Sequence, residues 1–125
     1  MGRDKLGTNM KKLTIIGGGN MGQAFALGLV RSGFASGRIT VTNPTLGRIR
    51  RLKAKKIALL TDNKEAVKSA DIVILAVKPQ VLLGVLKESK GYLKKDALII
   101  SIAAGISIKK IEKALDGKYP IVRVM

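Results

Sequence analysis

Six short runs of apolar residues, each followed by a stretch with helical spacing, constrain the fold of this chain most strongly. The runs lie at residues 13–16, 39–42, 57–60, 72–77, 98–102 and 121–124. Several are apolar at every position, which is typical of strands that are buried on both faces. Strands that alternate with helices form a parallel sheet with right-handed crossovers. The pattern therefore predicts a single-domain α/β protein with a doubly wound, mostly parallel sheet in three layers, α/β/α.

The stretches between the runs carry signals for the starts and ends of helices. Helices are expected at residues 20–32, at 46–56, after Asp62, at 80–89 and after Ser107. Glu65 follows Asp62 at the spacing of a capping box. In the helix over 46–56, Leu46, Ile49 and Leu52 recur at helical spacing, so it is expected to be amphipathic with a basic outer face.

A glycine motif joins the first apolar run to the first helix. Gly17, Gly19 and Gly22 have the spacing of the dinucleotide-binding fingerprint, in the strand–turn–helix context that the fingerprint requires. Gly17 would allow a tight turn, Gly19 a close approach of pyrophosphate, and Gly22 close packing of the helix on the strand. The free N–H groups near Asn20 and Met21 would face phosphate oxygens. The motif predicts a Rossmann fold that binds a dinucleotide; a glycine-rich turn without a ligand is the alternative.

The end of the second run bears on which dinucleotide is bound. NAD-binding proteins carry an acidic residue there, which binds the ribose 2′-hydroxyl. This chain has the neutral Asn43, followed by Thr45 and Arg48, which would attract a 2′-phosphate. We therefore expect NADP(H), with NAD(H) as the alternative cofactor. A second interpretation is that Asn43 or Thr45 caps the basic helix.

The charge of the chain is strongly positive. Its 24 Lys and Arg residues against 8 Asp and Glu give a formal net charge of +16. The cations are spread along the chain, and only 3% of the residues are aromatic, which disfavours a nucleic-acid partner. With no histidine and no cysteine, no metal site is expected. No apolar run has the length of a membrane span and no signal peptide is evident, so we expect a cytoplasmic protein without a membrane partner.

Several segments together identify a family. "IGGGNMG", "VTNPT", "DNKEAVKSADIVILAVKPQ", "SIAAGISIKKIEKAL" and "RVM" resemble the N-terminal half of pyrroline-5-carboxylate reductase, over residues 10–125. The resemblance implies hydride transfer from NAD(P)H to the imine of 1-pyrroline-5-carboxylate, which gives L-proline. It also implies that residues 16–21 hold the pyrophosphate, Asn43 and Asn63 the adenosine end, 77–79 the nicotinamide ribose and 103–105 the nicotinamide ring.

Taken together, the glycine motif and the resemblance predict one set of cofactor contacts. The set is Ile16, Gly17, Gly18, Gly19, Asn20, Met21, Gly22, Asn43, Thr45, Arg48, Asn63, Ala76, Val77, Lys78, Pro79, Ala103, Ala104 and Gly105. No catalytic residue is assigned. Lys78 is the ionisable side chain expected at the strand ends, with a solvated loop lysine as the alternative.

The chain also departs from the family. The family continues with a Pro-Asn-Thr-Pro-like loop and a helical domain that supplies the substrate site and the dimer contact, and neither follows residue 125 here. Residues 1–9 are expected to be an extension, 10–125 the dinucleotide-binding domain, and the chain alone inactive. The last apolar run is expected to mediate self-association through residues 120–125.

Two alternatives to this family remain open at the level of sequence. One is another NADP-dependent oxidoreductase, of the coenzyme F420-dependent or β-hydroxyacid dehydrogenase type. The other is a nucleotide-binding module without catalysis. Pro44 stands where some relatives have an arginine, which bears on the expected preference for NADP(H).

Overall fold

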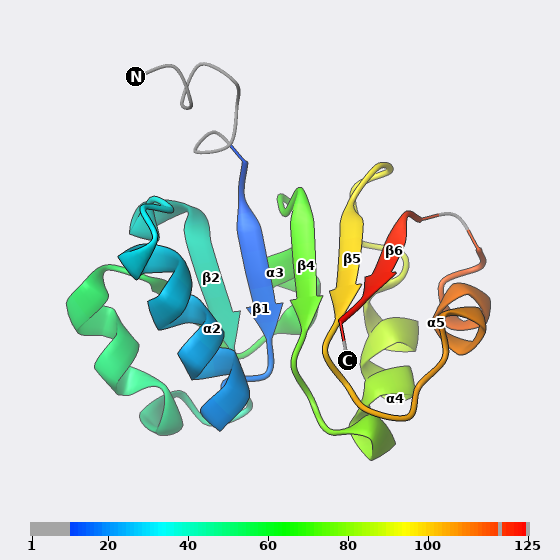
Figure 1. Ribbon diagram of the computed structural model, residues 1–125, viewed down its shortest axis with the longest axis horizontal. Helices are drawn as coiled ribbons and strands as arrows, with labels where there is room; N and C mark the ends of the chain where they lie inside the picture. Colours follow the sequence, from blue (N-terminus) through cyan, green and yellow to red (C-terminus); the bar gives the residue numbers. More distant parts are fainter. Residues whose placement is uncertain (1–10, 118, 125) are drawn as a thin grey trace.

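A six-stranded parallel sheet forms the centre of the molecule (Figure 1). The structure, a computed structural model, describes residues 11–117 and 119–124. The strands are β1 (Leu13–Ile16), β2 (Ile39–Thr42), β3 (Ala58–Leu60), β4 (Ile72–Leu75), β5 (Leu98–Ser101) and β6 (Ile121–Arg123). Their order is β3-β2-β1-β4-β5-β6, and every neighbouring pair is parallel. The predicted doubly wound α/β/α fold is confirmed.

Helices lie on both faces of the sheet (Figure 1). The α-helices are α2 (Asn20–Arg31), α3 (Asn63–Val67), α4 (Pro79–Ser89) and α5 (Ile108–Ala114). Three short 3₁₀ helices, η1 (Ser36–Arg38), η2 (Leu46–Arg48) and η3 (Arg50–Lys55), complete the described helical structure. Helix α2 packs in front of β1 and β2, whereas α3, α4 and α5 lie behind the sheet.

Two aliphatic clusters form the core, one on each face of the sheet. Ile15 and Val41 are fully buried in the front cluster, under α2 and η3. Ile99 and Ile111 are fully buried in the rear cluster, under α4 and α5. Burial on both faces explains why β4, at the centre of the sheet, is apolar throughout.

The prediction of one basic helix over 46–56 is wrong. The segment forms η2 and η3, with a break at Ile49, and ends at Lys56 in the left-handed conformation (φ 64°). Ile49 and Leu52 are buried as expected, but Leu46 is 43% exposed. Closely spaced like charges repel each other along an α-helix, and the segment has no acidic residue to offset them.

Several predicted bounds also differ from the structure. The strand expected at 72–77 ends at Leu75, the one at 98–102 ends at Ser101, the one at 121–124 ends at Arg123, and the one at 57–60 begins at Ala58. The helix expected to begin at Gln80 begins at Pro79, because proline fits the first helical position, where no N–H is needed.

Both predicted helix caps form, but the capping box expected at Asp62 does not. Ser107 accepts a hydrogen bond from the Lys110 N–H at the start of α5. Asp62 accepts from the Lys64 N–H. Glu65 does not complete the predicted capping box, because its carboxylate pairs with Lys68, 3.3 Å away.

Asp71 connects two other segments at the edge of the sheet where the strands begin. Its carboxylate accepts hydrogen bonds from the Lys94 Nζ at 2.5 Å and from the Lys12 N–H at 2.8 Å. The Lys94 hydrogen bond, followed by the Lys12 N–H, holds the pKa of Asp71 below its ordinary value. The residues directly before β1 and β4 and the loop before β5, which are far apart in the sequence, are thereby joined.

Among the described residues, no helix has both the length and the apolar character needed to cross a bilayer. The same part of the chain contains no group of three or more Asp or Glu side chains placed to hold a metal ion.

Candidate dinucleotide-binding site

The glycine loop turns sharply between β1 and α2. Gly17 has φ +106°, and a side chain there would place its first carbon 2.7 Å from the backbone O of Ala76. A side chain at Gly22 would collide with the backbone O of Gly17, so α2 rests directly on the loop. The chain therefore needs glycine at both positions to fold this turn.

Gly18 is fixed by packing rather than by the fingerprint. A side chain at this position would collide with the Ile49 side chain, which fills the core under η3. The loop and the basic segment consequently share one packed contact.

Gly19 differs from its neighbours because it faces open space. A side chain there would meet no atom within 4 Å, and Gly19 is the N-cap of α2 without a side-chain cap. No described residue accepts a hydrogen bond from the backbone N–H of Asn20 or Met21. Open space in front of free N–H groups at a helix N-terminus suits a phosphate group.

Gln23 connects this loop to η2. Its side chain is 7% exposed; Nε2 donates to the backbone O of Gly18 at 2.7 Å and to that of Arg48 at 3.1 Å. Its Oε1 accepts from the Arg51 Nε at 2.7 Å. Gln23 was not among the predicted contacts; a polar side chain on the buried side of α2, next to Gly22, was the available signal.

The residues after β2 form a turn that leaves Thr45 and Arg48 exposed. The Asn43 N–H donates to Leu60 O at 3.1 Å, and its Nδ2 donates to Thr45 O at 2.8 Å. Neither Asn43 nor Thr45 caps η2 with its side chain, so the capping alternative is wrong. Arg48 has no ion-pair partner among the described residues. Its guanidinium is therefore available to an anion.

Asn63 stands at the start of α3, beside the end of β2. Its Oδ1 accepts a hydrogen bond from the Thr42 Oγ1 at 2.6 Å, and its Nδ2 lies 3.3 Å from the Glu88 carboxylate. The amide is thus held toward the edge of the sheet where β1 and β2 end.

The loops after β4 and β5 lie side by side. Leu75 and Ser101 are neighbours in the sheet, and the Ile102 N–H donates to Leu75 O at 3.2 Å. The Ala76 N–H donates to Ile16 O at 2.8 Å, which places the β4 loop next to the glycine loop.

Small and exposed groups dominate these two loops. Lys78 is exposed at the N-cap of α4, and Pro79 follows it. Ala103 is buried, with its N–H 3.3 Å from the Ser101 Oγ, whereas Ala104 and Gly105 are exposed. Val77 is half-buried between the β4 loop and the rear cluster.

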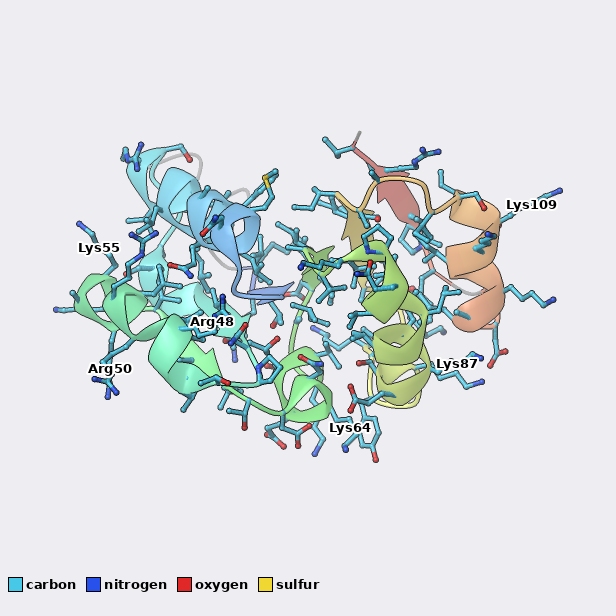
Figure 2. All side chains as sticks on the ribbon, turned by 90° about the horizontal axis from the view of Figure 1, so that it is seen from below. Arg48, Arg50, Lys55, Lys64, Lys87 and Lys109 are labelled. Carbon is cyan, nitrogen blue, oxygen red and sulfur yellow. The ribbon has the colours of Figure 1, made fainter. Side chains whose placement is uncertain are left out.

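The predicted contacts therefore line one edge of the sheet, at the C-terminal ends of β2, β1, β4 and β5. The strand order reverses direction between β1 and β4, where open α/β sheets bind ligands. Figure 2 views this edge and shows Arg48 nearer its middle, whereas Arg50 and Lys55 project from the outer side. Thr45 and Arg48, after β2, lie toward one end of the edge, and residues 103–105, after β5, lie toward the other, as an extended ligand requires.

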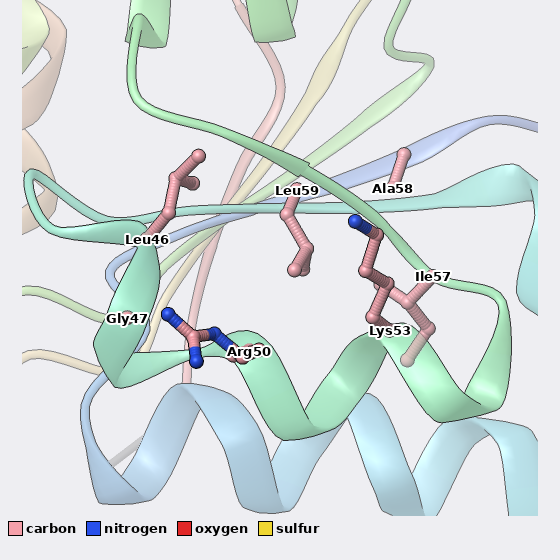
Figure 3. Close-up of a pocket in the computed structure, with 7 residues that line it drawn as sticks. All are labelled: Leu46, Gly47, Arg50, Lys53, Ile57, Ala58 and Leu59. Atoms are coloured by element: carbon pink, nitrogen blue, oxygen red, sulfur yellow. The ribbon is translucent and has the colours of Figure 1, made fainter.

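A separate cavity of about 400 Å³ lies at the outer side of β3 (Figure 3). Its lining residues are Leu46, Gly47, Arg50, Lys53, Ile57, Ala58 and Leu59. None of them belongs to the predicted cofactor contacts, but Leu46 and Gly47 lie between Thr45 and Arg48, so the cavity adjoins the β2 end of that edge.

Comparison with known proteins identifies the family. Residues 12–105 match the family described as NADP oxidoreductase, coenzyme F420-dependent. The chain is 38% identical over 119 residues to pyrroline-5-carboxylate reductase of Pasteurella multocida, covering 92% of this chain and 43% of that protein.

Solved structures agree with this assignment. The pyrroline-5-carboxylate reductase of Coxiella burnetii superposes with a TM-score of 0.87 at 39% identity, covering 92% of this chain and 43% of that one. The Plasmodium falciparum enzyme, solved with NADP bound, gives a TM-score of 0.82 at 31% identity, covering 95% and 43%.

The chain spans less than half the length of these relatives. It belongs to the NADP oxidoreductase, coenzyme F420-dependent family, and it corresponds to the N-terminal NAD(P)-binding domain of pyrroline-5-carboxylate reductases.

Proposed function

We propose that this chain is the cofactor-binding part of a reductase that converts 1-pyrroline-5-carboxylate to L-proline, and that it binds NADP(H) in preference to NAD(H). The observation that carries the proposal is Gly19, which is open to solvent and stands before the free N–H groups of Asn20 and Met21. The names of the relatives supply the reaction and the substrate.

Different groups of the described residues would bind different parts of the cofactor. The N–H groups at the start of α2 would bind the pyrophosphate, assisted by the dipole of that helix. Thr45 and Arg48 would bind the 2′-phosphate, since both are exposed and Arg48 has no ion-pair partner in the described part of the chain.

Residues 103–105 would lie against the nicotinamide, because a short alanine and a glycine let a flat ring approach the backbone. When bound, the reduced cofactor supplies a hydride to the imine carbon, and the imine nitrogen gains a proton. The residues of this chain would position the ring at the C-terminal ends of β4 and β5.

Holding the imine against the nicotinamide is a second requirement of the reaction. Positioning of this kind supplies about 7–11 kcal/mol of barrier lowering. We therefore propose that turnover needs the C-terminal region that the longer relatives contain.

A complementation assay tests the proposed reaction. Proline formation from 1-pyrroline-5-carboxylate and NADPH is measured with this chain alone, with the separately produced C-terminal region of the Coxiella burnetii reductase alone, and with both together. We expect turnover only from the mixture, or from the two parts fused in one chain. Turnover by this chain alone at rates typical of enzymes would contradict the proposal that turnover needs the C-terminal region. A fused protein that folds, binds NADPH and makes no proline would contradict the proposed reaction.

A further inference from the structure

Half of the front face of the sheet carries aliphatic side chains that no helix covers. Figure 1 shows α2 in front of β1 and β2, and no helix in front of β4, β5 and β6 among the described residues. The register pairs Ile100 with Val122, so the two side chains share this face. We call the surface made by Leu98, Ile100, Ile102, Val122 and Val124 the open half-face.

The burial of alternate residues along β5 supports this description. Ile99 and Ser101 point to the rear face and are fully buried. Ile100 and Leu98, which point forward, are only half-buried. On β6, Val122 is 45% exposed, and Val124, which directly follows the strand, is 50% exposed.

Helix α2 forms a wall beside the open half-face. An apolar hollow of about 400 Å³ runs along it, lined by Met21, Ala24, Phe25, Gly28 and Leu29. Phe25 and Leu29 belong to the same apolar cluster as Ile100 and Ile102, so the wall of α2 is continuous with the open half-face.

Such a surface requires a cover. Parallel sheets are normally covered by helices on both faces, and an exposed apolar patch of this kind marks an interface. The face presents side chains rather than backbone groups, so a helix with one apolar side fits it better than an added strand.

We propose that the open half-face and the wall of α2 dock an amphipathic helix from the C-terminal region that follows this domain in the longer relatives. Those relatives extend beyond the matched 43% of their length. The described chain also ends at the border of this surface, where the Val124 N–H donates to Ser101 O at 2.8 Å.

A second copy of the chain is a less suitable occupant. Each copy carries a formal net charge of +16, and close approach of two such molecules is opposed by their repulsion. A helix continued from β6 meets the surface without that penalty. The docked helix would lie next to residues 102–105 and so bring the second region to the nicotinamide end of the site.

Thiol labelling tests this inference without cofactor or activity, so its outcome is independent of the proposed reaction. The chain contains no cysteine, so a single thiol can be placed at will. Val122→Cys probes the open half-face, and Leu46→Cys is the matched control, since Leu46 is 43% exposed but lies at η2. The rate of reaction with N-ethylmaleimide is measured in this chain at low concentration, and in a fusion with the C-terminal region of the Coxiella burnetii reductase.

We expect the thiol at position 122 to react at least tenfold more slowly in the fusion, and the thiol at position 46 to change less than twofold. Equal rates at position 122 in the two proteins would overturn the proposal. Protection that appears on concentrating the isolated chain, and not in the fusion, would assign the face to a second copy and also overturn it.

A second measurement covers the case of a fusion that does not fold. Binding of an apolar fluorescent dye to the isolated chain should fall several-fold in the variant Val122→Lys with Val124→Lys, and stay unchanged in Leu46→Lys. The separately produced C-terminal region should displace the dye. Unchanged dye binding in the double lysine variant, or no displacement of the dye by the C-terminal region, would contradict the proposed docking.

Discussion

The side-chain amide of Gln23 lies 2.7 Å from the backbone oxygen of Gly18 and, with the same nitrogen, 3.1 Å from that of Arg48. One buried side chain therefore joins the loop proposed for the pyrophosphate to the turn proposed for the 2′-phosphate. Arg51 holds the other end of the amide.

We predict that Gln23→Leu destabilises the protein and weakens NADPH binding. Two backbone oxygens would lose their donor in a buried place, which costs roughly 1–3 kcal/mol of unfolding free energy. Gln80→Leu is the control, because Gln80 is exposed on α4. Urea unfolding and NADPH titration measure the two effects, and equal stability of the two variants would rule out the role of Gln23.

Arg48→Ala should reduce the preference for NADPH over NADH about tenfold while leaving NADH affinity unchanged. A charge-assisted contact to phosphate contributes about 1.5–3 kcal/mol, and exposure brings Arg48 to the lower end. Arg50→Ala is the matched control, since Arg50 points outward beside the β3 cavity. Calorimetric titration with both cofactors decides the matter: an unchanged ratio in Arg48→Ala would contradict the proposed contact.

Asp71→Asn should lower stability by roughly 1 kcal/mol at pH 7, because the hydrogen bonds to the charged carboxylate are weakened. The pKa of Asp71 is lowered in the folded state from 3.8, so its contribution is complete above that pH. The difference between variant and wild type should shrink as the pH falls below 3.8 toward the folded pKa. Asp96→Asn, an exposed acid nearby, is the control. A difference that is constant from pH 7 to pH 2 would be inconsistent with this account.

Self-association through β6 stays a prediction. The strand is the outer edge of the sheet, Val122 on it and Val124 just after it are exposed, and residue 125 lies outside the described residues. With the open half-face uncovered, the isolated chain should associate weakly as salt screens its charge. Sedimentation should show a mass that grows with salt and concentration, and Val122→Lys should suppress the growth. A monomer at high salt and high concentration would contradict this expectation.

The sheet, its order and the glycine turn followed from the sequence because they rest on local patterns. Apolar runs and their spacing determine which segments are strands, and only glycine fits at Gly17 and Gly22. Most element bounds differ by one or two residues because the ends of helices and strands fray and carry no sharp signal in the sequence.

Features that depend on tertiary contacts could not be predicted from local sequence patterns. The basic segment over 46–56 has helical spacing, yet it forms two 3₁₀ helices because Ile49 packs against Gly18 and Arg51 binds Gln23. The open half-face could not be predicted either, since a strand that is uncovered on one face can have the same apolar sequence as a strand that is buried on both faces.

Calorimetric titration of NADPH into wild type and Gly19→Asp tests the central claim most directly. Aspartate is a favourable N-cap and meets open space at this position, so the fold should be kept and the thermal midpoint equal or higher. The Gly19→Asp carboxylate would occupy the proposed phosphate position. Two variants serve as controls. Gly19→Asn adds a side chain of the same size without the charge, and Gly91→Asp adds the same charge at a distant exposed glycine. The account predicts that wild type and Gly91→Asp bind NADPH, that Gly19→Asn binds it more weakly, and that Gly19→Asp binds at least tenfold more weakly than wild type. Unchanged NADPH affinity in a folded Gly19→Asp, or no binding by wild type, would contradict it.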